Sequence, residues 1–333
     1  MSKRNKVAII GTGGTISSVG RGPFDLQNYL TLGKMLDADG MVKTFPQAAE
    51  FADLIPVAFP PVPSTDMNFP AWVKLSEIID GLVVEHADLS GVVILHGTAS
   101  MEESAYALDL TLRVDIPVVF TGAQRPSTGL STDAALNLAN AVRVAAAPEV
   151  RGLGVLVVLN DEIHAAREVT KTSTWRVQTF RAPDFGALGY ADADTIAIYR
   201  RPARRHAPHG PFSIDDLKSP ARVDISYCYA GVDGTAVRAF VAAGARGIVS
   251  AGFAPGMVSP EEMKALKEAV AAGLVVVQSS RGGSGRVPTT ERIADAGMIG
   301  ADNLNPQKAR IFLSLALNRT SDVAQIRELI ETC

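Results

Sequence analysis

The segment VVILHGTASMEE, residues 92–103, has the pattern of a buried strand followed at once by the start of a helix. Val92–Leu95 is a continuous apolar run rich in β-branched residues, as expected for a parallel strand that is covered on both faces. Ser100–Glu103 has the spacing of a capping box, in which serine and glutamate satisfy free backbone N–H groups at the helix start. Thr98 lies at the junction, where α/β proteins commonly bind ligands. This unit predicts an α/β fold.

Similar apolar runs alternate with amphipathic segments along the chain, which predicts parallel strands wrapped by helices. The runs are Val7–Ile10, Val92–Leu95, Pro117–Phe120, Val155–Leu159, Val223–Tyr227, Gly247–Ser250 and Leu274–Val277. A second helix start follows in Ser259–Glu262, with proline at the first helical position, and Gly273 ends that helix. Helical patterns over residues 306–319 and 322–332 close the chain.

Length and proline content predict two domains. The chain has 333 residues, whereas a single hydrophobic core stops growing near about 250–300 residues. Pro202, Pro208, Pro211 and Pro220 crowd one segment, and proline at that density disfavours regular structure. We predict a larger N-terminal domain over residues 1–201, a linker over 202–222 and a smaller C-terminal domain over 223–333.

Composition excludes several classes of protein. Hydrophobic residues make up 47% and charged residues 20%, which is typical of a globular chain rather than a disordered one. The net charge is −3, and the one dense basic cluster, Arg200–Arg205, is interpreted as a solvated linker, so no nucleic-acid partner is expected. No apolar stretch approaches about 18 residues and no signal peptide is evident, so we expect no membrane contact and a cytoplasmic location. The 2 cysteines and 5 histidines lack ligand spacing, so no metal and no cofactor are expected.

Polar segments after the predicted strands carry the candidate chemistry. Ile10–Ile16 is a glycine-rich turn that brings Gly14 and Thr15 to a strand end, but it lacks the spaced glycines of a dinucleotide site and the Lys-Ser/Thr pair of a P-loop. Pro63–Met67 is a polar turn ahead of a helical pattern. Ala166–Thr174 places Lys171 among threonines, where a lysine is usually solvated.

Together these segments resemble the bacterial L-asparaginases, in the same order along the chain. The matching motifs are Thr12–Ile16, Asn28-Tyr29, Ser64–Met67, His96–Glu103, Gly122–Ser127, Thr170–Thr172, Leu188–Tyr190, Ile248–Gly252 and Asn305–Arg310. The resemblance covers essentially the whole chain. It implies two doubly wound α/β domains, a larger N-terminal and a smaller C-terminal one. It also implies an amidohydrolase that releases ammonia from a side-chain (ω) carboxamide of a small molecule without a cofactor.

The resemblance implies four catalytic residues, Thr15, Tyr29, Thr98 and Lys171. Thr15 matches the nucleophile and Tyr29 a neighbouring tyrosine on a mobile flap, while Thr98 and Lys171 match a second threonine and its lysine partner. A threonine hydroxyl needs a group that removes its proton, and a lysine can do so only when burial lowers its pKa. The resulting acyl-enzyme divides amide hydrolysis into two easier steps.

The resemblance also implies a substrate pocket shared between subunits of a homodimer or homotetramer. Its expected lining in this chain is Gly14, Ser64, Thr65, Gly97, Ala99 and Ala123. Ser64 matches a serine that binds the substrate α-carboxylate, and the backbone carbonyl of Ala123 matches the acceptor for the scissile amide nitrogen.

The chain departs from the family where the substrate ammonium group binds. Ala99 stands where the family has an aspartate that holds the lysine and binds the α-ammonium. Met257 stands where many members have asparagine, and Thr65 where a glutamine or glutamate is common. Because a desolvated ammonium without a counter-charge is strongly penalised, one hypothesis is a substrate whose amide lacks the α-amino group.

Other interpretations stay open. In one interpretation, Glu102, Asp66 or Glu291 compensates for the missing aspartate, and the chain is an ordinary asparaginase. Alternatively, Ala99 disables catalysis and the protein is a catalytically impaired ligand-binding homologue. We do not expect a subunit of a tRNA-dependent amidotransferase, because that function needs a partner chain.

Overall fold

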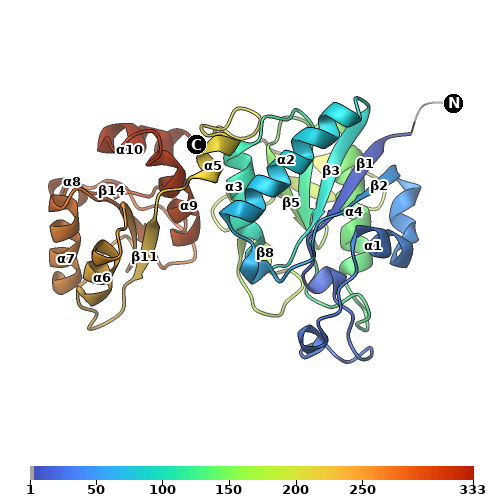
Figure 1. Cartoon of the computed structure of the whole chain (residues 1–333), viewed down its shortest axis with the longest axis horizontal. Coiled ribbons are helices and arrows are strands. Elements are labelled where there is room, and N and C mark those ends of the chain that lie inside the picture. The colour runs from blue at the N-terminus through green and yellow to red at the C-terminus, as the bar shows by residue number, and fades with distance from the viewer. Residues whose placement is uncertain (1–3) are drawn as a thin grey trace. The chain divides into compact units, whose positions relative to one another are not determined.

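The computed structural model describes residues 4–333 and divides into two compact units, Met1–His209 and Gly210–Cys333 (Figure 1). Each unit combines one main sheet with helices. The prediction of two α/β domains, the larger one N-terminal, is confirmed. The division falls inside the segment that was predicted to link the domains.

The main sheet of the first unit has eight strands in the order β10-β9-β6-β5-β4-β3-β1-β2. Figure 1 shows β5, β3, β1 and β2 in this sequence across the sheet. The strands are β1 Lys6–Gly11, β2 Asp53–Val57, β3 Leu89–Leu95, β4 Val118–Thr121, β5 Val155–Leu159, β6 Glu162–Ala165, β9 Gly189–Ala191 and β10 Ile196–Ile198. Every predicted strand of this unit is present.

The sheet is mixed rather than wholly parallel, which corrects the sequence prediction. Strands β1 to β5 pair in parallel, whereas β6, β9 and β10 continue the sheet antiparallel. The reversal occurs at Asn160 and Asp161, which have φ values of 51° and 66° between β5 and β6. Two consecutive residues with positive φ form the tight turn that suits a twisted hairpin, and asparagine and aspartate tolerate this conformation.

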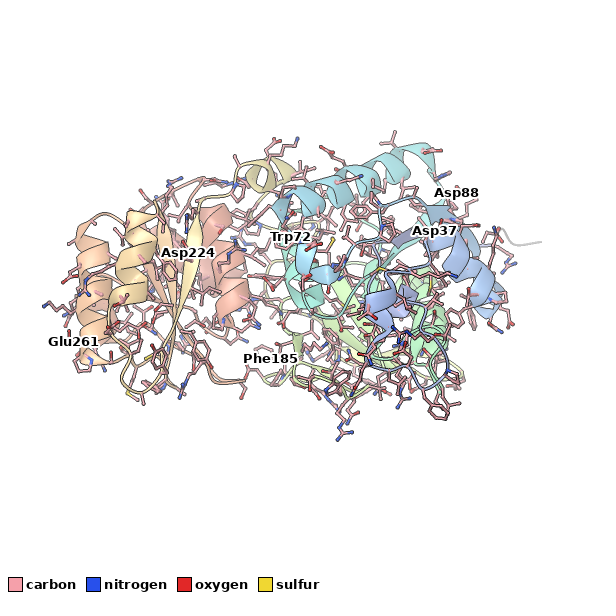
Figure 2. The ribbon with its side chains drawn as sticks, turned by 60° about the horizontal axis from the view of Figure 1, so that its bottom comes forward. Asp37, Trp72, Asp88, Phe185, Asp224 and Glu261 are labelled. Carbon is pink, nitrogen blue, oxygen red and sulfur yellow. The ribbon has the colours of Figure 1, made fainter. Side chains whose placement is uncertain are left out.

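Helices cover both faces of this sheet. Helices α1 (Ala38–Thr44) and α4 (Ala134–Ala146) share a core with Val7, Ile9 and Val93, the side chains on one face. Helices α2 (Phe69–Glu85) and α3 (Met101–Thr111) pack together and against strands β3 and β5. Between them the indole of Trp72, labelled in Figure 2, donates to Ser104 Oγ at 2.8 Å. The short 3-10 helices are η1 Thr15–Ser17, η2 Tyr29–Leu32, η3 Pro46–Glu50, η4 Ser64–Asp66 and η5 Pro148–Val150.

Helix α3 begins where the sequence predicted, but the predicted capping box is wrong. The Ser100 side chain makes no capping hydrogen bond. Its hydroxyl instead donates to the backbone carbonyl of Ser64 at 2.5 Å. A long-range partner therefore replaces the local one, and it ties the start of α3 to the turn that carries Ser64.

The second unit contains a four-stranded parallel sheet in the order β11-β12-β13-β14. Its strands are β11 Val223–Tyr227, β12 Gly247–Gly252, β13 Val275–Ser280 and β14 Ile299–Gly300, and its helices are α5 Ile214–Lys218, α6 Thr235–Ala242, α7 Pro260–Ala271, α8 Glu291–Asp295, α9 Pro306–Ala316 and α10 Val323–Thr332. The Ser259 hydroxyl accepts from the Glu262 N–H at 3.0 Å, so this predicted helix start is confirmed. Both cysteines, Cys228 and Cys333, are buried, and neither is in a disulfide.

The segment 202–222 is not wholly irregular, although its prolines predicted that it would be. Helix α5 lies inside it, and its start is fixed by a capping box between Ser213 and Asp216. Asp216 also pairs with Arg319 at 2.7 Å. Among residues 4–333, no helix is both long and apolar enough to cross a membrane.

Candidate active site

The candidate site lies where the order of parallel strands changes direction. In the sheet, β1 lies between β2 and β3. The chain passes from β1 to β2 on one side and later to β3 on the other side. At such a point the loops after the two central strands diverge and leave a crevice beyond their carboxyl ends, where α/β proteins bind ligands. The loop after β1 carries Thr15, and the loop after β3 carries Thr98.

Glycines let three turns approach one another at backbone distance. A Cβ atom on Gly14, whose φ is +85°, would lie 2.1 Å from the Cα of Gly97. A Cβ atom on Gly97 would lie 2.7 Å from both Cβ and Oγ of Ser64. Only glycine fits such contacts, so the turns that carry Thr15, Thr98 and Ser64 meet around one space.

That space is a cavity of about 290 Å³ within the first unit. Its lining residues are Gly14, Thr15, Tyr29, Leu30, Pro63, Ser64, Thr65, Gly97, Thr98, Ala99, Gln124, Lys171, Thr174 and Trp175. The structure thus brings together every site residue that the sequence singled out except Ala123. Ala123 is fully buried after β4, and its neighbour Gln124 lines the cavity instead.

Lys171 and Thr98 form a close pair in this cavity. Lys171 Nζ donates to Thr98 Oγ1 at 2.7 Å. Burial lowers the pKa of Lys171, while the nearby Glu102 carboxylate raises that pKa in part. In its neutral form the same amine can accept a proton from the Thr98 hydroxyl, because the two atoms already lie at hydrogen-bond distance.

Glu102 is the acidic residue that the structure places beside Lys171. Its carboxylate accepts from the Lys171 backbone N–H at 3.3 Å. Asp66 is exposed in η4 and does not line the cavity. Glu291 lies in α8, in the second unit. Among the three proposed substitutes for the missing aspartate, Glu102 therefore has a direct contact with the lysine, although it too is outside the cavity lining.

Thr15 and Tyr29 form the second hydroxyl pair. Thr15 Oγ1 and the Tyr29 hydroxyl lie 2.8 Å apart, and either oxygen can be the donor. Thr15 is the first residue of η1 and Tyr29 the first of η2. Both side chains line the cavity, so the nucleophile candidate has a polar partner within hydrogen-bond distance.

His96 forms a hydrogen bond within the turn after β3. Its ring is fully buried, and Nδ1 lies 2.7 Å from the carbonyl oxygen of Gly97. Since a carbonyl only accepts, Nδ1 carries the proton. Burial lowers the pKa of His96 to about 4, which keeps the ring neutral. The sequence placed His96 in a motif but assigned it no role.

A hairpin forms one wall of the cavity. Strands β7 (Thr170–Lys171) and β8 (Phe180–Arg181) pair antiparallel and carry Lys171 next to the connecting loop. In that loop Thr179 Oγ1 donates to the carbonyl of Ser173 at 2.5 Å and accepts from the Ser173 N–H at 2.9 Å. The exposed indole of Trp175 contributes to the rim.

The cavity contains hydroxyls and a single ionisable amine but no carboxylate. None of its lining residues is aspartate or glutamate. Ala99 is exposed and leaves the family's aspartate position without a charged side chain. Within residues 4–333 there is also no group of three His, Cys, Asp or Glu side chains that could hold a metal ion.

Comparisons with known proteins agree with the fold. The model for "Asparaginase, N-terminal" matches residues 6–204, and that for "Glutaminase/Asparaginase C-terminal domain" matches residues 222–330. The Haemophilus influenzae protein named "Probable L-asparaginase periplasmic" is 39% identical over 98% of this chain and 92% of its own length. L-asparaginase 2 of Escherichia coli is 39% identical over 97% of this chain and 92% of its own length.

The same relationship holds for solved structures. A probable cytoplasmic L-asparaginase from Campylobacter jejuni matches with a TM-score of 0.91 and 38% identity, over 99% of this chain and 100% of that one. The chain is thus a hydrolase that acts on amide C–N bonds and is built from two α/β domains. The chain belongs to the asparaginase family, as its sequence motifs predicted.

Proposed function

We propose that this enzyme hydrolyses the ω-carboxamide of a small carboxylic acid and releases ammonia through a threonine nucleophile. The observation that supports this most directly is the 2.7 Å contact between Lys171 Nζ and Thr98 Oγ1 in the cavity that also contains Thr15. A lysine whose pKa is lowered by burial is a suitable general base. A ligand-binding homologue without catalysis would not need this arrangement.

In the proposed reaction Thr15 Oγ1 attacks the amide carbon, and the hydroxyl proton passes to a neighbouring base. The C–N bond then breaks, the nitrogen takes up a proton and leaves as ammonia, and the acyl group stays on Thr15 as an ester. Water hydrolyses the ester to give the acid and restores the hydroxyl. Tyr29, at 2.8 Å from Thr15, is positioned to relay the first proton. We assign the substrate carboxylate to Ser64. Ala123 has no role in this proposal, because it is fully buried and does not line the cavity.

L-Asparagine is the first substrate to test, because the relatives are named for it. A second candidate class is favoured by the absence of aspartate and glutamate from the cavity lining. The lining that this chain supplies would give an α-ammonium group no counter-charge, and the group would be poorly stabilised there. The second class therefore comprises monoamides of dicarboxylic acids without an α-amino group, such as succinamate.

The test is ammonia release from L-asparagine, L-glutamine, succinamate and glutaramate, with Thr15→Ala as the inactive control. Release from any of these that is abolished by Thr15→Ala supports the proposed function. Higher kcat/KM for succinamate than for L-asparagine supports the second substrate class, and the reverse order contradicts it. No release from all four amides would contradict the proposed function and favour an impaired homologue.

Assembly and location are further parts of this proposal. We propose a homodimer or homotetramer that shares its active sites, because the family resemblance implies it. A cytoplasmic location stays a prediction, since one relative carries "periplasmic" in its name and another "cytoplasmic".

A further inference from the structure

We propose that Gln124 determines substrate specificity by donating a hydrogen bond from its side-chain amide to the carboxylate of the substrate. This inference rests on the proposed function, because it takes the cavity as the site of amide hydrolysis. Gln124 is an addition to the predicted site residues, which comprise the nucleophile, the lysine pair and the lining of the substrate pocket.

The backbone of Gln124 is held firmly in the loop after β4. Asp133, just before α4, accepts from the backbone N–H groups of Gln124 and Arg125 at 2.9 and 3.0 Å. Asn137 Nδ2 donates to the carbonyl of Gly122 at 2.9 Å and also reaches Asp133 at 3.2 Å. These bonds fix the backbone of Gln124 relative to the sheet, so its side chain starts from a fixed point at the cavity wall.

Gln124 lines the cavity, yet its side-chain amide nitrogen is unsatisfied. Gln124 is only 8% exposed. Its Nε2 atom is buried and has no hydrogen-bond partner within the described part of the chain. A buried donor without an acceptor destabilises the protein. A turn of the Gln124 side chain toward the cavity would bring this donor to an acceptor on a ligand and remove that penalty.

The rest of the cavity indicates which ligand group supplies the acceptor. Thr15, Ser64, Thr98 and Lys171 present hydroxyls and an amine, and no lining residue is acidic. A carboxylate has two oxygens with about four acceptor positions, more than Ser64 alone can fill. Hydrogen bonds to a charged acceptor are also stronger than those to a neutral amide oxygen. The substrate class that fits is a carboxylate-bearing amide without an ammonium group.

Gln124→Met tests the inference, because methionine has nearly the same length and no donor. We expect KM for succinamate to rise about tenfold with kcat little changed, the usual scale for losing one hydrogen bond to a charged group. KM for propanamide, which lacks the carboxylate, should not change. Thermal unfolding of the variant should be unchanged or shifted upward, since an unsatisfied buried group is removed. A purely structural role would instead lower the unfolding temperature and affect both amides alike.

Two further variants sharpen the result. Gln124→Glu should weaken the binding of succinamate, because the two carboxylates repel each other. It should also raise kcat/KM for L-asparagine relative to that for succinamate. Gln47→Met makes the same replacement at an exposed position of η3, outside the cavity, and should leave all kinetic constants unchanged.

Calorimetric titration of succinate into Thr15→Ala and into Thr15→Ala/Gln124→Met separates this inference from the proposed function. Succinate binding about tenfold weaker in the double variant would support the role of Gln124 even if no amide is turned over. Equal succinate affinities would overturn it. A rise in KM for L-asparagine but not for succinamate in Gln124→Met would overturn it as well, because the side chain would then serve as an acceptor for the ammonium group.

Discussion

Lys171 connects burial to catalysis at the scale of single residues. Its pKa is lowered by burial, so the fraction of neutral amine rises at a lower pH than for a free lysine. If this amine is the base, kcat/KM should increase with pH up to a plateau, with a midpoint below 10.5, the ordinary lysine value. Measuring the pH–rate profile of the wild type checks this expectation.

Lys171→Arg provides the matched comparison, because the guanidinium keeps its charge at every working pH. We expect kcat to fall by about 10²- to 10⁴-fold, the usual contribution of a general base. The rising limb of the pH profile should also disappear. If Lys171→Arg retains that limb, another group titrates and Lys171 is not the base.

His96 predicts how stability changes with pH. Its folded pKa of about 4 lies below the ordinary value of 6.5, so the unfolded chain takes up a proton first as the pH falls. The contribution of His96 to the free energy of unfolding is therefore complete above about pH 6.5. It is lost toward pH 4, by on the order of 3 kcal/mol. His96→Asn keeps a donor near Gly97 but cannot be protonated. It should be less stable at pH 7 and show a shallower loss between pH 6.5 and 4 in urea unfolding. An unchanged slope would assign the acid sensitivity to other groups.

At the scale of elements, the β7–β8 hairpin controls the position of Lys171. Thr179 is fully buried and makes two hydrogen bonds with Ser173 across the loop. Thr179→Val preserves the shape but removes both bonds, at about 1 kcal/mol each. We expect faster hydrogen exchange over residues 172–178 and a severalfold lower kcat, because small misplacements of a catalytic group are costly. Thr172→Val, which loses only its hydroxyl bond to the Thr179 carbonyl, is a milder comparison. Normal exchange with reduced kcat would contradict this explanation.

The elements that the sequence predicted are those whose signal is local. The central strands are continuous apolar runs, and all of them were found. Strand β2 was missed because it is largely accessible and contains Pro56, a residue typical of sheet edges. Strands β9 and β10 were missed because they have three residues each and depend on antiparallel partners.

For the candidate site, too, the sequence predicted the residues with a local signal and missed those without one. Thr15, Ser64, Thr98 and Lys171 could be found because each lies in a recognisable sequence motif. The unsatisfied amide of Gln124 and the rim position of Trp175 had no local signal, since both depend on the folding of distant loops. The capping box at Ser100 was wrong for a related reason. A long-range acceptor, the Ser64 carbonyl, competes with the local one.

At the scale of the whole molecule, the proposed sharing of active sites predicts that activity depends on assembly. We expect light scattering to give the mass of two or four chains of 35.1 kDa. Specific activity should fall on dilution when the assembly dissociates, because monomers would have incomplete sites. A monomer with full activity would contradict this prediction. It would also mean that the cavity of the first unit needs no second chain.

The positions of the two tryptophans give this enzyme a built-in optical reporter. The chain has 2 tryptophans. Trp72 is 2% exposed, whereas Trp175, at the cavity rim, is 59% exposed. The indole of Trp72 should therefore emit at short wavelength and resist aqueous quenchers, while that of Trp175 should emit to the red and be quenched readily. A ligand that fills the cavity should change the second component alone. Substrate binding then becomes visible in the unmodified protein by fluorescence, with Trp175→Phe as the silent reference.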